Sequence, residues 1–152
     1  MKYLLLTLII TLGLNACSLE NGVDMESAPE ESDTGEVEQK WKLVQMSGSI
    51  ANVPPTTGSD MPWQEYYVLY TDSTFLKSRT VGGVEEQAGG TYAFVVLEDG
   101  EYLELSYASD NELIGNCSQE AKEFLYLENE DKLIGTWWAC DGPGLVYQRV
   151  EE

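Results

Sequence analysis

Residues 91–107 read Thr-Tyr-Ala-Phe-Val-Val-Leu-Glu-Asp-Gly-Glu-Tyr-Leu-Glu-Leu-Ser-Tyr, and this stretch carries the clearest structural signal in the chain. Two apolar runs flank Asp99-Gly100, and glycine tolerates the positive φ that a tight β-turn requires. In the second run apolar and polar residues alternate, so one face of that strand packs against a core and the other meets water. The stretch therefore predicts a β-hairpin with strands over 91–97 and 101–107.

The same rhythm continues on both sides of this hairpin. From residue 40 onward, short apolar or alternating runs are separated by turn residues, a spacing typical of consecutive hairpins. We expect an all-β fold, a small antiparallel up-and-down barrel of about eight strands. Besides the two strands of the hairpin, the predicted strands cover 40–46, 64–70, 74–80, 112–117, 123–128, 132–138 and 144–150.

The segments between these strands are predicted to be irregular. The glycine pairs at 82–83 and 89–90 indicate turns, and Ser118 is placed to cap one helical turn before the strand at 123. The stretch 47–62 contains several proline and glycine residues and is the longest predicted loop. Long loops in compact domains are often binding loops or lids.

Residues 1–16 have the composition of a secretory signal. Lys2 precedes an apolar run that is too short to span a bilayer as a helix and suits the core of an export signal. The run ends at Leu14-Asn15-Ala16-Cys17, which resembles the bacterial lipobox. The resemblance implies cleavage before Cys17 and acylation of its sulfur, which would attach the mature chain to a lipid bilayer. Ser18 stands where aspartate retains some lipoproteins at the inner membrane, so we expect the outer membrane, on its periplasmic or surface side.

The segment from Cys17 to residue 39 is rich in carboxylates and has no aromatic residue. Such a segment cannot bury enough surface to offset the entropy lost on ordering. We therefore expect a disordered acidic tether over 17–39 and a barrel domain over 40–152. Acidic residues after a lipidated cysteine resemble surface-export signals of some Bacteroidetes lipoproteins, and a plain spacer is the alternative.

The charge balance limits the possible functions. The chain has 27 acidic and 8 basic residues, a formal net charge of −19, and no histidine. Such a surface repels the phosphates of nucleic acids and the headgroups of anionic lipids, so we expect no nucleic-acid partner. Histidine is the commonest general base and metal ligand, and neither a GxSxG nucleophile motif nor a phosphate-binding loop is present. We expect no enzymatic activity, no cofactor and no metal, although scattered carboxylates leave a catalytic pair formally open.

Cys117 and Cys140 are the two cysteines that remain besides Cys17. The exported compartment permits disulfides, and the predicted strand ends near these two residues would meet at one rim. We expect a structural disulfide worth about 3–3.5 kcal/mol by the chain-entropy relation. Two free thiols or a metal pair are the alternatives, and a zinc site without histidine is unfavourable.

The order of these features resembles the lipocalin-like lipoproteins of Bacteroidetes. The residues that carry the resemblance are the opening Trp41-Lys42-Leu43, the link Cys140-Asp141-Gly142-Pro143 and the closing Tyr147-Gln148-Arg149. It implies that Arg149 packs over the ring of Trp41 in a cation–π contact and closes the barrel between its first and last strands.

A lipocalin-like barrel implies room for one small ligand. The aromatic residues that we expect to line such a pocket, with ordinary core packing as the alternative for each, are Tyr66, Tyr92, Phe94, Tyr107 and Trp137. In the predicted strand 132–138, Trp137 and Trp138 point to opposite faces, so one indole is expected to be exposed as a contact surface.

Two functions follow from this reasoning. The first is a membrane-anchored, monomeric lipoprotein that binds a small apolar or amphipathic ligand in the cell envelope. The alternative is an acidic interaction or inhibitor barrel that captures a cationic protein. Small lipoprotein inhibitors of lysozyme are similar barrels with a Ser-Gly-x-x-Ala-x-Tyr element, and residues 47–51 (Ser-Gly-Ser-Ile-Ala) match its beginning. An apolar cavity would favour the first function and a filled core the second; an envelope protein with no ligand is the third possibility.

Overall fold

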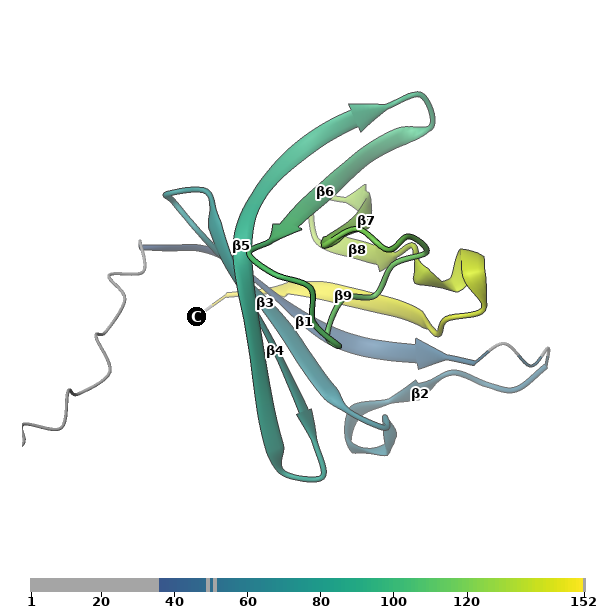
Figure 1. Cartoon of the computed structure of the whole chain (residues 1–152). Helices are drawn as coiled ribbons and strands as arrows, with labels where there is room; N and C mark the ends of the chain where they lie inside the picture. The colour runs from purple at the N-terminus through teal and green to yellow at the C-terminus, as the bar shows by residue number, and fades with distance from the viewer. Residues whose placement is uncertain (1–35, 49, 51, 152) are drawn as a thin grey trace, which may run out of the picture. The chain divides into compact units, whose positions relative to one another are not determined.

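A computed structural model describes residues 36–48, 50 and 52–151 of the chain, which form an all-β barrel (Figure 1). Its strands are β1 (Val37–Ser47), β2 (Thr56–Thr57), β3 (Gln64–Tyr70), β4 (Thr74–Val81), β5 (Val84–Leu97), β6 (Gly100–Tyr107), β7 (Lys122–Asn129), β8 (Lys132–Gly135) and β9 (Gly144–Val150), with short 3₁₀ helices η1 (Gly58–Asp60) and η2 (Trp137–Cys140).

The barrel closes between its first and last strands. The sheet runs in the order β1-β3-β4-β5-β6-β7-β8-β9, and β9 pairs with β1 to complete a ring of antiparallel neighbours. The short β2 pairs with the end of β1 outside this ring. Within the ring, each strand pairs with the next one along the chain, which confirms the predicted up-and-down barrel of about eight strands. In the described residues no helix is long and apolar enough to cross a membrane.

Because consecutive strands run in opposite directions, their connections alternate between two ends of the barrel. The turn end holds the first residue of β1 and the tight turns at 71–73, 98–99 and 130–131. The loop end holds the turn at 82–83 and the long connections at 48–63, 108–121 and 136–143. These two names are used below.

Alternate residues of the strands point into the barrel and are almost excluded from solvent. They form one apolar cluster that includes Trp41, Leu43, Met46, Leu69, Phe75, Leu103, Leu105, Leu125, Leu133 and Leu145. Side chains of this size fill the axis of an eight-stranded barrel. The interior is therefore packed, and it also contains charged residues that sequence patterning does not lead one to expect inside.

The structure corrects the prediction for Gly89-Gly90. These residues lie in the middle of β5, which extends from Val84 to Leu97, and do not form a turn. A Cβ atom at Gly90 would overlap the backbone of Ser106 and Tyr107, so only glycine allows β5 and β6 to approach this closely. The strand bends at this point and pairs with β4 before it and with β6 after it.

Two other predicted elements are wrong. Residues 112–117 form no strand and Ser118 begins no helical turn, since the whole connection 108–121 is irregular. The predicted strand 132–138 stops at Gly135 and continues as η2. By contrast, β3 and β9 have the predicted bounds, and β1, β4, β6 and β7 extend the predicted strands by a few residues at most.

Candidate functional site

Four charged side chains lie together at the loop end of the barrel interior. We call Glu65, Lys77, Arg79 and Glu123 the interior ion cluster. The ammonium group of Lys77 has no solvent exposure and lies 3.4 Å from Glu65 Oε1 and 3.1 Å from Glu123 Oε2. Arg79 Nε donates to the other oxygen of Glu65. Two cations thus neutralise two carboxylates, which is the condition under which buried charge is tolerated.

Three buried tyrosines complete the bonding of these carboxylates. Tyr67 and Tyr107 donate their hydroxyls to Glu123, and Tyr147 donates to Glu65. Burial, followed by the nearby carboxylates, raises the pKa of all three phenols above the ordinary value. The hydroxyls therefore stay protonated and act as donors to the ion cluster.

The interior ion cluster also fixes the 108–121 loop. Lys77 Nζ donates to the carbonyl of Leu113 at 2.6 Å, and Arg79 donates to the same carbonyl at 3.2 Å. The N–H of Gly115 donates to Glu123 at 3.2 Å. Because these charge-assisted bonds join backbone to buried ions, the loop is held over the loop end of the barrel.

A disulfide joins this loop to η2. Cys117 of the loop is bonded to Cys140 of η2, with 5.6 Å between their Cα atoms. This confirms the predicted pair, although Cys117 lies in a loop and not at a strand end. The indole of Trp137 packs against Gly115 and Gly142, where a Cβ atom would collide with it. The 3₁₀ turn is thus held on two sides.

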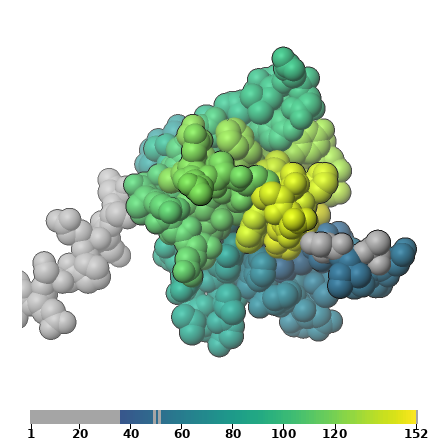
Figure 2. All heavy atoms as spheres, turned by 45° about the vertical axis from the view of Figure 1, so that its right-hand side comes forward, coloured from purple at the N-terminus to yellow at the C-terminus, as the bar shows by residue number. Residues whose placement is uncertain are grey.

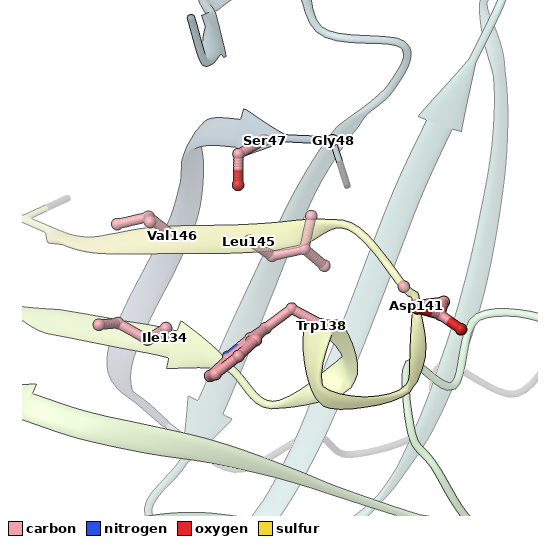
Figure 3. A pocket seen from close by; sticks show the side chains of 9 residues that line it. Ser47, Gly48, Ile134, Trp138, Asp141, Leu145 and Val146 are labelled. Carbon is pink, nitrogen blue, oxygen red and sulfur yellow. The ribbon is translucent and has the colours of Figure 1, made fainter. Parts of the chain in front are cut away.

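Trp138 is the exposed member of the tryptophan pair. Trp137 packs against the core, whereas Trp138 is 62% exposed. It stands beside an open hollow of about 480 Å³ whose walls come from β1, β8, η2 and β9 (Figure 3). We call Ser47, Gly48, Trp138 and Asp141 of this hollow the rim site. An indole held on a fixed turn beside a hollow is typical of a protein contact surface.

A second hollow of about 460 Å³ is also lined by Ser47 and Gly48. It is mostly apolar and is lined by residues of the 48–63 connection, among them Val53, Pro54 and Trp63. Ile50 and Val53 in this connection are also largely exposed. The rim site therefore adjoins an apolar hollow that shares Ser47 and Gly48 with it.

The aromatic residues predicted to bind a ligand do not line one pocket. Tyr107 is part of the barrel interior, and Trp137 of η2 packs against the core. Tyr66 lines a hollow with Lys40, Lys42 and Val150. Tyr92 and Phe94 lie on the β5–β6 hairpin with ring centroids 6.1 Å apart.

Trp41 and Arg149 face each other across the closing seam of the barrel. They are partners in the β1–β9 register, and the indole N–H of Trp41 donates to Gln39 at 3.1 Å. Both residues line a hollow of about 210 Å³ at the turn end, together with Phe94 and Leu127. The cation–π contacts found among the described residues involve Lys40, Lys77 and Arg79. The expected contact of Arg149 with the Trp41 ring is not among them, and backbone pairing of β1 with β9 closes the barrel here.

No family model, curated protein or solved structure matches the chain. Cys17, the leader and most of the predicted tether lie outside the described residues. Within 36–48, 50 and 52–151, no group of three or more cysteine, aspartate and glutamate side chains is placed to hold a metal ion.

Sequence reasoning missed the interior ion cluster, although the pattern contained a signal for it. Glu65 shares a strand face with Tyr67 and Leu69, and Lys77 shares one with Phe75, because alternate residues point the same way. Charged residues are rarely buried unless paired, so a single strand gives no reason to place them inside. Only the matching charges on several strands make the interior position favourable.

Proposed function

We propose that this chain is a lipid-anchored, non-enzymatic envelope protein whose acidic barrel binds a basic protein partner through the rim site. The observation that carries the proposal is Trp138, a 62% exposed indole on a turn that the disulfide and the packing of Trp137 hold in place. A rigid aromatic side chain next to a hollow contributes binding energy at little entropic cost.

The packed interior favours this function over a ligand held inside the barrel. The axis of the barrel is occupied by buried side chains, and the ion cluster and the 108–121 loop occupy its loop end. Binding there would require breaking the charge-assisted bonds of Lys77 and Glu123. The hollows described above are open to the outside, which suits a partner that docks on the surface.

The charge of the chain indicates what kind of partner would bind. With a net charge of −19, the protein attracts basic proteins and repels acidic ones. Asp141 lies in the rim site and Asp60 lines the neighbouring hollow. Ser47 and Gly48, with which the stretch that resembles the lysozyme-inhibitor element begins, line both hollows. A small, strongly basic lysozyme is therefore the first probe to use.

The test measures the dissociation constant of this lysozyme for the purified protein at two salt concentrations. Trp138→Ala should weaken binding by about tenfold or more, because truncating a central tryptophan removes a contact that dominates such interfaces. Val84→Ala is the matched control, since Val84 is 66% exposed and lines neither hollow beside Ser47-Gly48, and it should change binding by less than about twofold. Binding should also weaken as salt rises.

Two results would contradict the proposal. One is an absence of lysozyme binding at low salt. The other is equal binding by the native protein and Trp138→Ala, which would show that the rim site makes no contact.

The hollow at the turn end supports a second function, the binding of a small amphipathic molecule. Trp41, Phe94 and Leu127 give this hollow apolar walls. Its charged lining consists of Arg149, Glu101 and Glu130. Its volume of about 210 Å³ is below the usual range for ligand pockets, which is why this function ranks second. Mass spectrometry of the protein under native conditions tests it, since a retained small molecule that Phe94→Ala loses would support it.

A further inference from the structure

The second half of β5 has one edge that is covered by none of the strands the structure describes. β4 pairs with β5 only over Val84 to Thr91, whereas β6 pairs with it from Gly90 to Leu97. Within the described part of the chain, the side of β5 that β4 occupies is therefore open beyond Thr91. The β5–β6 hairpin stands out from the barrel in this region and forms the projection at the top of both views (Figure 1 and Figure 2).

The backbone at this edge is oriented for further hydrogen bonding. Tyr92 donates its N–H to the carbonyl of Ser73 at 2.9 Å, on the same side as β4. Backbone groups of alternate residues point the same way along a strand, so the N–H and C=O groups of Phe94 and Val96 also face this side. The register with β4 has ended by then, and these groups face no strand of the described residues.

The side chains along the edge are apolar and exposed. Phe94, Val96 and Leu97 are 39%, 81% and 49% exposed, and no charged residue occurs between Glu86 and Glu98. Proteins usually protect such edges with charges, proline or short strands, because an unprotected edge pairs with other chains. Residues 92–97 contain neither a charge nor a proline.

Carboxylates stand at both ends of this open edge. The hydroxyl of Tyr92 donates to Glu38 at 2.7 Å, and the acidic turn Glu98-Asp99 follows Leu97. A second copy paired antiparallel would bring its own acidic turn toward the Glu38 end, and the like charges would repel. An extended segment with an apolar centre and a lysine or arginine at each end matches both features.

We propose that residues 92–97 bind an extended segment of a basic protein, which adds to the sheet as one more strand beside β5. The added strand lies where β4 would continue beyond Thr74, and six residues of β5 provide about 20 Å of pairing. Backbone bonds to Phe94 and Val96 hold the segment, and the carboxylates at the ends select lysine and arginine. This surface is separate from the rim site and does not depend on its function.

The probe for this proposal is the synthetic peptide Lys-Val-Thr-Val-Thr-Val-Lys, titrated into the purified protein while the amide resonances of Phe94 and Val96 are followed. Val96→Pro removes an edge N–H that the isolated protein does not use, and proline is tolerated on edge strands, so the variant should fold. Val96→Thr keeps this N–H and is the matched control. Circular dichroism checks that both variants are folded.

We expect Val96→Pro to weaken binding of the lysine peptide by about tenfold or more, and Val96→Thr to weaken it by less than about twofold. The same peptide with glutamate at both ends should bind about tenfold more weakly than the lysine peptide. Trp138→Ala should bind the lysine peptide as the native protein does, which separates this surface from the rim site.

Three results would overturn the proposal. The first is no binding of the lysine peptide, and the second is equal binding by native protein and Val96→Pro. The third comes from sedimentation: a dimer of the native protein that Val96→Pro abolishes would show that the edge serves self-association and not a basic partner.

Discussion

Lys77 is a lysine whose side chain is wholly inside the barrel, between two carboxylates. Replacing it by methionine keeps much of the volume but leaves Glu65 and Glu123 with one cation for two negative charges. Breaking a buried ion pair in this way costs about 3–5 kcal/mol of folding free energy. We expect Lys77→Met to lower the free energy of unfolding by this amount, measured by urea denaturation.

The control for this variant is Lys122→Met. Lys122 pairs with Glu104 on the barrel surface, where both side chains are partly exposed, and surface pairs contribute about 1 kcal/mol or less. A second comparison adds Glu123→Gln alone to Lys77→Met. This leaves one cation, Arg79, for one carboxylate, Glu65, and should restore part of the lost stability. Equal losses for Lys77→Met and Lys122→Met would show that the interior ion cluster is not a stabilised unit.

The buried tyrosines predict how stability depends on alkaline pH. The pKa values of Tyr67, Tyr107 and Tyr147 are raised in the folded protein, first by burial and then by the carboxylates around them. In the unfolded chain they return to about 10. A pKa that is higher when folded gives stability that is complete below pH 10 and is lost as the pH rises above it.

We therefore expect phenolate absorbance to rise in two phases as the pH increases above about 10. Exposed tyrosines ionise gradually, and the buried ones ionise together with the loss of circular dichroism. A titration in which all tyrosines ionise before the dichroism changes would contradict this coupling. Tyr147→Phe, which keeps the ring in the core, should reduce the second phase.

At the scale of elements, β5 depends on the absence of a side chain at Gly90. A Cβ atom there would overlap the backbone of β6, and overpacking of this kind costs about 1–3 kcal/mol. We expect Gly90→Ala to lower the midpoint of thermal unfolding. Gly48→Ala should shift it little, since a Cβ atom at Gly48 would have no other residue's atom within 4 Å beyond its chain neighbours. Similar midpoints for the two variants would mean that β5 and β6 do not approach each other at Gly90 as closely as described.

The strands that sequence reasoning found are those with alternating or continuous apolar runs. β3, β6 and β9 were predicted almost to the residue, because their apolar residues lie on one face or fill a buried run. The sequence does not predict the first half of β5, because glycine pairs usually mark turns. Here the glycines are needed because their backbone lies against the backbone of neighbouring strands, which the sequence of β5 alone does not reveal. Residues 112–117 were assigned to a strand from local composition, but buried ions on β4 and β7 bind their backbone.

The predicted disulfide and the predicted ligand residues differ in the same way: the first can be predicted without assigning strand faces, and the second cannot. The pairing of Cys117 with Cys140 follows from the cysteine count, the expected export and the expected approach of two strand ends, none of which needs the face of a strand to be assigned. The grouping of Tyr66, Tyr92, Phe94, Tyr107 and Trp137 required the face of every strand to be assigned correctly, and one residue of register moves a side chain to the other face. The sequence predicts that one of Trp137 and Trp138 is exposed but not which one. That choice depends on the 3₁₀ turn that replaces the end of the predicted strand.

At the scale of the whole molecule, the rim site and the start of β1 lie at opposite ends of the barrel. β1 begins with Val37 at the turn end and reaches Ser47 at the loop end, and eleven residues of strand span about 35 Å. In the proposed lipoprotein, a chain anchored at Cys17 would join the barrel at its turn end. The rim site would then face away from the point of attachment, where a partner in the surrounding space can approach it.

Attachment through Cys17 is the prediction on which this arrangement depends. An acidic protein gains nothing from anionic headgroups, so its membrane affinity has to come from acyl chains, at about 0.8 kcal/mol for each buried methylene. We expect the native chain to fractionate with membranes and its N-terminal peptide to carry the mass of added acyl groups, whereas Cys17→Ser should be found in the soluble fraction. The double variant Cys117→Ser with Cys140→Ser should stay with the membrane, because the disulfide holds η2 and not the anchor. An unmodified Cys17 in the native protein would remove the anchor, while the rim site and the β5 edge would still be tested by their own experiments.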